Sequence, residues 1–284
     1  MLTESQRTAL AEDGYLCIPS LFTEEELGPL RAAANELVKR RGPNVVGELD
    51  GSPNVRMVFG AHAEDEVFSR LCRHPRLLHP VEQSLGEPVH LFQSRLNAKS
   101  SFAGGGWAWH QDFNQWYRQD GMRTPRATVV GVFLDDVNAC NGPLMMIPRS
   151  QQRGFIPVPE QMDIPLEIVT DMANEYGIVP LMGPPGTAIF FDCLTIHGSA
   201  PNVSPWSRRI FYCNYIPASC HELQPLREWF HCDTKVNALT ALDDDCLLQV
   251  EDRQSCLSRS PEPSEAASQQ TGRIACPPPA GASR

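Results

Sequence analysis

The stretch WHQDFNQWYRQDGM, residues 109–122, places a histidine and an aspartate two positions apart, at His110 and Asp112. On a β-strand, residues i and i+2 project from the same face, so both side chains could point into one interior. An imidazole nitrogen and a carboxylate oxygen that converge on one point are common metal ligands. A hydrogen-bonded histidine on a surface loop is the alternative that this tripeptide leaves open.

A third ligand is expected from a histidine much later in the chain, on another strand. His197 fits this position, because it ends the apolar run GTAIFFDCLTIHG where a strand meets a glycine turn. Two histidines and one carboxylate that leave one face of the metal open are typical of non-haem Fe(II) oxygenases. A zinc hydrolase could use the same three ligands.

Arg208 follows His197 by eleven residues and opens the predicted strand RRIFYCNYI. A guanidinium one strand away from the metal could bind a dicarboxylate such as 2-oxoglutarate through two parallel hydrogen bonds. A surface ion pair is the alternative role for an arginine here, and Arg209 is the better candidate for it. A zinc hydrolase would leave Arg208 unexplained.

The elements that must position these residues follow from hydrophobic periodicity. A capping box at Thr3–Gln6, later threonine and glycine signals and helical spacing predict helices over 5–13, 24–42 and 74–86. The basic residues 38–42 are interpreted as the last turn of the second helix. From about residue 88, short β-rich runs separated by Gly, Pro and Asn predict an α+β chain whose C-terminal portion is an all-β barrel or sandwich.

Composition narrows the class of protein. The 284 residues carry a net charge of -10, which argues against nucleic-acid binding. No apolar run approaches the roughly 18 residues of a membrane span, and the first residues lack signal-peptide features, so we expect a cytoplasmic protein without a membrane partner. The ten cysteines include no C-x-x-C pair and are expected to be reduced. Residues 251–284, rich in Ser, Pro and Gly, are predicted to be a disordered tail.

From about residue 89 to 217 the sequence resembles the phytanoyl-CoA dioxygenase superfamily of Fe(II)/2-oxoglutarate enzymes, within it the ectoine hydroxylases and the proline trans-4-hydroxylase-type amino-acid hydroxylases. The similar segments are FQSRLNAK, WAWHQDFNQW, PRATVVGVFLDDV, NGPLMMIP and GPPGTAIFFDCLTIHGSAPNVSPWSRR. The resemblance implies a mainly β double-stranded β-helix, a jelly-roll or cupin-like barrel with N-terminal helices packed outside. It implies one dioxygenase domain over 1–250, in which residues 1–87 are mainly helical, residues 88–217 form a jelly-roll core and residues 218–250 add C-terminal elements.

The resemblance also assigns roles to individual residues. It places the iron ligands at His110, Asp112 and His197. It places the cosubstrate 2-oxoglutarate on Arg208, Ser199, Gln93 and Asn97.

For the substrate, the resemblance points to two residues. At the position of Trp116, ectoine hydroxylases place an aromatic ring against a cyclic, charged substrate. Arg227 in PLREWF would reach a substrate carboxylate. The sequence departs from the family at Arg149 and Gln151, where relatives read glycine and histidine in IPGSH, and at Asn114 and Gln115, which replace residues that flank the substrate in ectoine hydroxylases. We therefore expect an altered substrate shell. A compact aromatic pocket is expected from the nearby residues Trp107, Trp109, Phe113, Trp116 and Tyr117.

The expected activity is hydroxylation of an unactivated C–H bond with Fe(II), 2-oxoglutarate and O2, releasing succinate and CO2. The substrate would be a small free amino acid or amino-acid-like metabolite, handled by a monomer or homodimer. Asp112 favours hydroxylation over halogenation, because halogenases of this superfamily replace that carboxylate with a small residue. Two alternatives stay open: desaturation or tailoring of a natural-product intermediate or carrier-bound substrate, and a noncatalytic cupin-like metabolite-binding protein.

Overall fold

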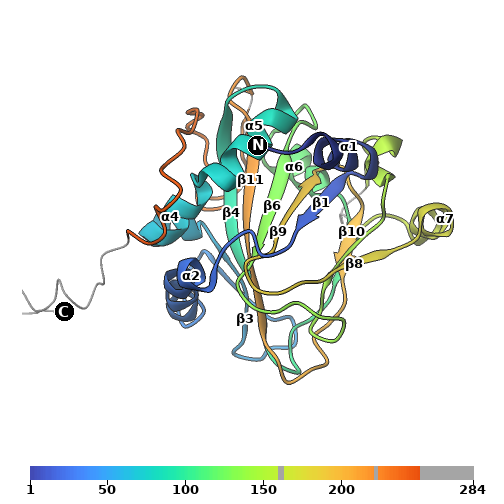
Figure 1. Cartoon of the computed structure of the whole chain (residues 1–284). Coiled ribbons are helices and arrows are strands. Elements are labelled where there is room, and N and C mark those ends of the chain that lie inside the picture. The colour runs from blue at the N-terminus through green and yellow to red at the C-terminus, as the bar shows by residue number, and fades with distance from the viewer. Residues whose placement is uncertain (159–162, 221–222, 250–284) are drawn as a thin grey trace, which may run out of the picture. The chain divides into compact units, whose positions relative to one another are not determined.

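The computed structural model describes residues 1–158, 163–220 and 223–249 (Figure 1). Residues 1–250 pack together as one compact unit. The predicted division of this unit into three segments stays a prediction, and the predicted disordered tail at 251–284 lies outside the described residues. None of the described helices is long and apolar enough to cross a membrane.

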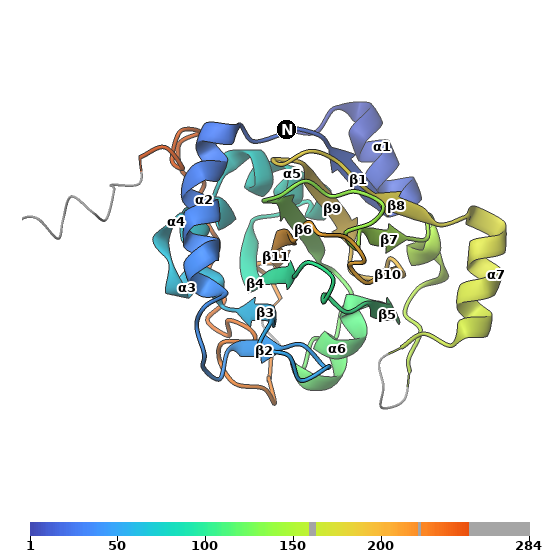
Figure 2. The ribbon, with the colours of Figure 1, turned by 90° about the horizontal axis from the view of Figure 1, so that it is seen from below.

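Two antiparallel sheets form the centre of the unit (Figure 2). The larger sheet contains, in spatial order, β1 (Tyr15–Ile18), β9 (Ala188–Asp192), β6 (Thr128–Phe133), β11 (Arg208–Pro217), β4 (Val89–Lys99), β3 (Val55–Phe59) and β2 (Val45–Gly47). The smaller sheet contains β5 (Trp107–His110), β10 (His197–Ser199), β7 (Leu144–Met146) and β8 (Val179–Leu181). The antiparallel β core is confirmed, whereas hydrogen-bond pairing among the described residues does not join the two sheets into a closed barrel.

The helices are distributed along the whole chain. They are α1 (Glu4–Asp13), α2 (Glu24–Leu37), α3 (Ala61–Glu64), α4 (Glu66–Cys72), α5 (Pro75–Leu85), α6 (Asp112–Gln119) and α7 (Leu166–Tyr176), with a 3-10 turn at Ser150–Arg153. The capping box at Thr3 and the left-handed glycines Gly14 and Gly86 confirm the predicted start of α1 and the ends of α1 and α5. The interpretation of residues 38–42 as a last helical turn was wrong, because α2 ends at Leu37.

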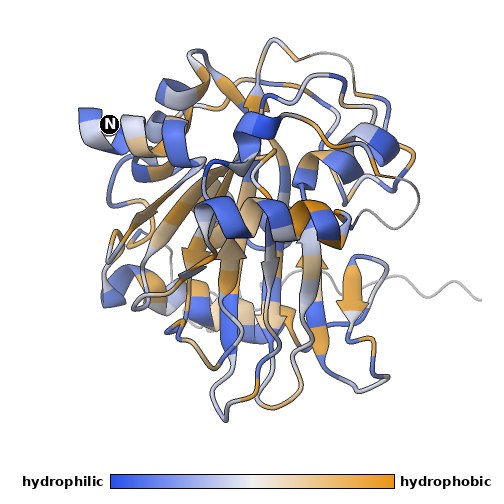
Figure 3. Cartoon of the chain, turned by 90° about the vertical axis from the view of Figure 1, so that its right-hand side faces the viewer, coloured by the Kyte–Doolittle hydropathy of each residue, from blue (hydrophilic) through white to orange (hydrophobic). Residues whose placement is uncertain are grey.

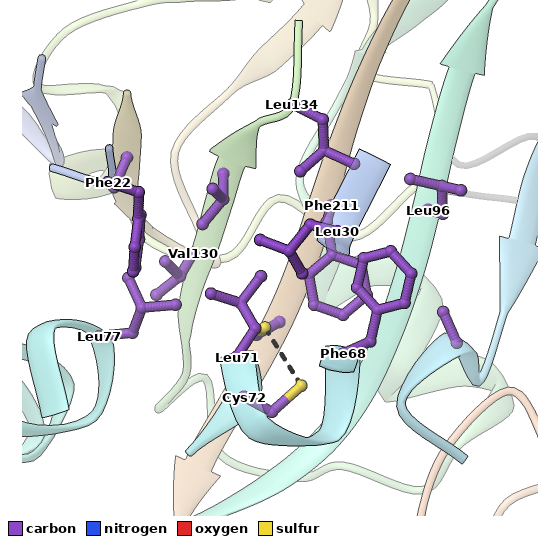
Figure 4. Packing of buried hydrophobic residues seen from close by; sticks show 14 of the residues in the cluster. Phe22, Leu30, Phe68, Leu71, Cys72, Leu77, Leu96, Val130, Leu134 and Phe211 are labelled. Carbon is purple, nitrogen blue, oxygen red and sulfur yellow. Dashed lines mark hydrogen bonds between the residues drawn. The ribbon is translucent and has the colours of Figure 1, made fainter. Parts of the chain in front are cut away.

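Helices α2, α4 and α5 cover the outer face of the larger sheet. Their apolar residues, among them Leu30, Phe68 and Leu77, belong to one buried cluster with strand residues such as Phe211 (Figure 4). The rings of Phe68 and Phe211 stack with centroids 4.5 Å apart. Figure 3 shows hydrophobic stretches along the strands and hydrophilic residues along the helices. This layer supports the central strand β11 from outside.

The inner face of the larger sheet packs against the smaller sheet. Phe191 and Tyr212 of the larger sheet share a buried cluster with Leu144 and Met146 of β7. The two sheets therefore face each other across a common interior, which is where the predicted site residues meet.

Several elements were not expected from the sequence. Residues 45–59 form the hairpin β2–β3, and β3 pairs with β4. Beyond residue 88, where only strands were expected, α6 and α7 are helical. The hairpin and α6 both contribute to the site.

Candidate metal centre and its pocket

The three predicted metal ligands come from three short elements. His110 ends β5, and His197, which begins β10, is its direct partner in the antiparallel pair. Asp112 is the first residue of α6, after an extended turn residue at Gln111. The expectation that His110 and Asp112 share a strand face was therefore wrong, because the strand ends at His110. The turn nevertheless brings the two side chains together.

The ligand atoms converge on one oxygen. The Nε2 atom of His110 lies 3.6 Å from Oδ1 of Asp112, and the Nε2 atom of His197 lies 3.9 Å from the same oxygen. All three ligand atoms lie within 4.8 Å of one another. Among the residues that the structure describes, this is the one such cluster of His, Cys, Asp or Glu.

Both imidazoles direct their Nε2 atoms to this point. The Nδ1 atom of His110 contacts the carbonyl oxygen of Ala108 at 2.7 Å, and that of His197 contacts the carbonyl oxygen of Thr195 at 2.9 Å. A carbonyl only accepts, so Nδ1 of each ring carries a hydrogen, and the neutral form of each ring has its lone pair on Nε2. Burial, with a smaller effect of His110, lowers the pKa of His197 to about 3, so this ring is neutral at pH 7.

Asp112 is ionised although it is buried. Burial alone raises its pKa, but the charge of Arg95, with smaller effects of His110 and His197 in their protonated forms, brings that pKa well below its usual range. The Nη2 atom of Arg95 lies 3.2 Å from Oδ2 of Asp112. The site therefore brings together one carboxylate and two imidazoles, a donor set suited to a divalent metal.

The cluster opens into a cavity of about 130 Å³ between the two sheets. Its lining residues are Met57, Phe59, Gln93, Arg95, Asn97, Trp107, His110, Asp112, Gln115, Leu144, Phe191, His197, Ser199, Arg208 and Tyr212. The predicted cosubstrate residues all line this cavity. Sequence reasoning missed the contributions of Met57 and Phe59 from β3, and of Arg95.

Strand β4 places alternate polar residues on the cavity. Gln93 accepts hydrogen bonds at Oε1 from Arg95, at 2.8 Å, and from Asn214, at 3.0 Å. Its amide nitrogen donates to the carbonyl oxygen of His231. Asn97 has a buried Oδ1 with no hydrogen-bond partner among the described residues, so this oxygen is available to a ligand.

Arg208 is buried and lacks an anionic partner. Its Nε donates to the carbonyl oxygen of Gly142 at 3.1 Å, and burial lowers its pKa. No carboxylate of the described residues makes an ion pair with it. Arg209, by contrast, pairs with Asp135 at 2.7 Å, as the sequence indicated. A buried, unpaired guanidinium in the cavity wall is suited to an anionic ligand.

A second basic side chain, Lys99, which sequence reasoning missed, contacts Ser199. The Nζ atom of Lys99 donates to Oγ of Ser199 at 2.9 Å, to the carbonyl oxygen of Gly105 at 2.8 Å and to that of Ala200. Burial, followed by the charge of Arg208, lowers the pKa of Lys99 to about 6. In its protonated form Lys99 can only donate, so Ser199 then directs its own hydrogen elsewhere.

The two predicted substrate residues do not line the cavity. Trp116 is buried, with its ring 5.3 Å from that of Phe92. Arg227 donates from Nε to Oδ1 of Asp120 at 2.8 Å. Their substrate contacts stay predictions.

Of the expected aromatic pocket, Trp107 lines the cavity, whereas Phe113 and Trp116 belong to a buried core cluster. The departures at Arg149 and Gln151 face α1. The amide of Gln151 donates to the carbonyl oxygens of Ala11 and Glu12, at 3.1 and 3.0 Å. These two substitutions therefore bear on the packing of α1.

Comparison with protein families matches residues 10–210 to phytanoyl-CoA dioxygenase (PhyH). The chain is 34% identical over 253 residues to L-proline trans-4-hydroxylase from Streptomyces griseoviridis, covering 83% of this chain and 94% of that protein. It is 34% identical over 238 residues to ectoine dioxygenase from Bordetella parapertussis, covering 75% of each.

Solved structures of EctD from S. alaskensis resemble the fold closely. The form with bound Fe has a TM-score of 0.76 and 33% identity, covering 85% of this chain and 87% of that one. The form with 2-oxoglutarate and 5-hydroxyectoine has a TM-score of 0.75 and 33% identity, covering 84% and 86%. The matched residues 10–210 include the whole histidine and aspartate cluster and Arg208, and the chain belongs to the phytanoyl-CoA dioxygenase (PhyH) family.

Proposed function

We propose that the protein is an Fe(II)- and 2-oxoglutarate-dependent dioxygenase that hydroxylates a small, polar, amino-acid-like substrate. One observation carries this proposal: the Nε2 atoms of two histidines face the same carboxylate oxygen of Asp112, while both Nδ1 atoms are held by backbone carbonyls. Two oriented imidazoles and one carboxylate of this kind fit a divalent iron.

His110, Asp112 and His197 would hold the iron. Bound there, iron supplies the activation of O2, coupled to oxidation of 2-oxoglutarate to succinate and CO2 while one oxygen atom enters a C–H bond of the substrate. The carbonyls of Ala108 and Thr195 fix the imidazole orientation, so the chain sets the donor directions before metal arrives.

The cosubstrate would lie between the metal site and Arg208. The guanidinium is buried and its nearest acceptor is a backbone carbonyl, so a distal carboxylate would supply its missing counter-charge. Ser199, which accepts from Lys99, is poised to donate its hydroxyl hydrogen to the same carboxylate. The unpartnered Oδ1 of Asn97 is a further polar contact for a ligand in this cavity.

The remaining cavity wall favours a small substrate. Trp107, Phe191 and Tyr212 supply ring surfaces, and Gln115 supplies a polar group from α6. Such surfaces suit a compact molecule with a positively charged nitrogen. The relatives named for proline and ectoine hydroxylation support an amino-acid-like substrate.

We extend the proposal to the closure of the barrel, the partners of the protein and its location in the cell. The two facing sheets and the likeness to EctD support a double-stranded β-helix barrel with the N-terminal helices outside. The net charge of -10 supports a small-molecule partner over nucleic acid. We place the protein in the cytoplasm, as a monomer or homodimer, without a membrane partner.

The test is an activity assay in which the protein is loaded with iron without oxygen and O2 is then admitted to start the reaction. The protein is incubated with Fe(II), 2-oxoglutarate and a panel of free amino acids and cyclic amino-acid derivatives, and products are analysed by mass for the gain of one oxygen atom. We expect one panel member to gain oxygen in step with succinate.

The His110→Ala variant should lose this turnover, whereas His79→Ala, which alters a partly exposed histidine of α5, should keep it. Succinate formation that needs no iron, or full activity of His110→Ala, would contradict the proposal.

A further inference from the structure

The two carboxylate oxygens of Asp112 have different surroundings. Oδ1 faces the Nε2 atoms of His110 and His197, at 3.6 and 3.9 Å. Oδ2 points the other way and accepts a hydrogen bond from Nη2 of Arg95 at 3.2 Å. An aspartate can bind a metal through one oxygen or both, and here the second oxygen already has a charged partner.

Arg95 is itself held in place. Its side chain is 11% exposed, and its Nη1 donates to Oε1 of Gln93 at 2.8 Å. Its guanidinium lies over the ring of Tyr212, 4.9 Å from the centroid, and the two residues are paired in the β4–β11 register. A guanidinium with a ring beneath it and two fixed acceptors has little freedom to leave Asp112.

The contacts continue away from the metal site. Gln93 accepts from Asn214 at 3.0 Å with the same oxygen that accepts from Arg95, and its amide nitrogen donates to the backbone of His231. Because oxygen and nitrogen of this amide have different partners, its orientation is fixed. A continuous hydrogen-bonded chain therefore runs from His231 through Gln93 and Arg95 to Asp112.

We propose that Arg95 is a positioning residue that restricts Asp112 to binding the metal through Oδ1 alone. A carboxylate that used both oxygens would occupy two coordination positions of the metal. The cosubstrate could then no longer bind at one of them. This inference rests on the proposed function, because it requires a metal at Asp112.

The experiment uses Co(II) as the metal probe, since the ligand-field absorption of Co(II) responds to coordination number. Wild type, Arg95→Met, Arg95→Lys and Arg76→Met are loaded with Co(II), titrated with 2-oxoglutarate and followed by visible absorption. Arg76 is the matched control, because it is also a partly buried arginine with carboxylate partners. Those partners are Glu26 and Asp244, and neither is a proposed metal ligand. Thermal unfolding of each variant verifies that it is folded.

We expect Arg95→Met to change the Co(II) absorption and to weaken 2-oxoglutarate binding at saturating metal by roughly tenfold, the size typical of a lost partner to a metal ligand. Arg76→Met should match wild type. Arg95→Lys should fall between, because an ammonium can reach Asp112 but cannot also hold Gln93 in the same fork. If Arg95→Met does not fold, Arg95→Gln takes its place.

The outcomes separate this inference from the proposed function. A wild-type spectrum that does not respond to 2-oxoglutarate overturns the proposed function. A responsive wild type together with an Arg95→Met variant of unchanged spectrum and unchanged 2-oxoglutarate affinity overturns the positioning role alone.

Discussion

Lys99 places its amino group among three oxygen atoms, at Ser199, Gly105 and Ala200. The charged groups that affect it are Arg208 and Arg56, which lower its pKa, and Glu48, which raises it. Burial has the largest effect, and the resulting pKa is about 6, against 10.5 for an ordinary lysine. The protonated form is therefore missing a counter-charge that an anionic ligand could supply.

From this we expect 2-oxoglutarate binding to take up a proton between pH 6 and 8. A bound carboxylate raises the pKa of Lys99, so the complex is protonated where the free protein is not. Affinity should be greatest near pH 6 and should fall as pH rises, by up to about tenfold per pH unit. Calorimetric titration of the metal-loaded protein in buffers of different ionisation heat measures the proton directly.

The Lys99→Met variant should bind 2-oxoglutarate more weakly and without this proton uptake. An affinity that does not vary with pH in wild type would mean that Lys99 does not change its charge on binding.

The chemical residues of the site could be predicted where only a few residue types can perform the role. His110, Asp112, His197 and Arg208 meet as the sequence indicated. Arg95 and Lys99 were missed, although Gln93 and Asn97 were predicted on the same strand and the alternation over 93–99 places all four on one face. What the sequence could not supply is the partner of each group, because the contacts of Arg95 and Lys99 join strands that are distant along the chain.

Among the elements, the hairpin β2–β3 supports one wall of the cavity through a buried ion pair. Arg56 and Glu48 are 6% and 2% exposed and lie 2.9 Å apart. The guanidinium of Arg56 also lies 3.9 Å above the ring of Trp107, and Glu48 accepts from the backbone of Gly105 at 3.3 Å. The pair thus connects the hairpin to the segment that leads into β5.

Replacing Glu48 by Ala should lower the free energy of unfolding by about 3 kcal/mol, because it leaves the charge of Arg56 buried without its carboxylate counter-charge. Removal of the exposed pair by Glu24→Ala should cost less than about 1 kcal/mol, since Arg31 then remains in contact with water. Urea unfolding of both variants measures the difference. Equal losses of unfolding free energy in the two variants would show that burial does not increase the contribution of the Arg56–Glu48 pair to stability.

The turn before β9 depends on glycine for two reasons. Gly186 has φ +81°, and a Cβ atom there would lie 2.1 Å from the carbonyl oxygen of Phe22. The same two residues are joined by the hydrogen bond from the Phe22 amide to the Gly186 carbonyl, at 3.1 Å. This contact fixes the chain between β1 and α2 against the edge of the larger sheet.

Gly186→Ala should therefore destabilise the protein by more than the cost of left-handed backbone alone. Gly86→Ala isolates that cost, because Gly86 has φ +78° with nothing within 4 Å of its Cβ position. We expect a loss of about 1 kcal/mol for Gly86→Ala and clearly more for Gly186→Ala, measured by urea unfolding. Similar losses would mean that the Phe22 segment moves aside freely.

Element boundaries were predictable where local capping decides them and not where tertiary packing does. Thr3, Gly14 and Gly86 define helix ends by their own chemistry. The strand VRMVF at 55–59 is buried at every position, so it shows no alternation and was missed. Helix α6 was missed because the spacing of His110 and Asp112 favours a strand, although Phe113 and Trp116 have the helical spacing of a buried face.

At the scale of the whole molecule, the candidate site joins the two sheets. His110 and His197 lie on the smaller sheet, whereas Arg95 and Arg208 lie on the larger one. A metal and a cosubstrate that contact both the histidines and the arginines would connect the two sheets, which otherwise contact each other through apolar side chains. The resemblance to known enzymes predicted this arrangement in outline, but the order of strands in each sheet follows from long-range pairing that no local pattern contains.

Ligand binding should consequently stabilise the whole unit, and metal and 2-oxoglutarate together should do so more than either alone. At a ligand concentration 100 times Kd, binding adds about 2.7 kcal/mol to the free energy of unfolding. For a unit of this size that corresponds to a rise in Tm of roughly 5–10 °C. Thermal unfolding with Co(II) and 2-oxoglutarate, then with excess EDTA, measures the shift and its reversal. His110→Ala should abolish the shift and His79→Ala should retain it; a shift that persists in His110→Ala would place the stabilising metal somewhere other than this cluster.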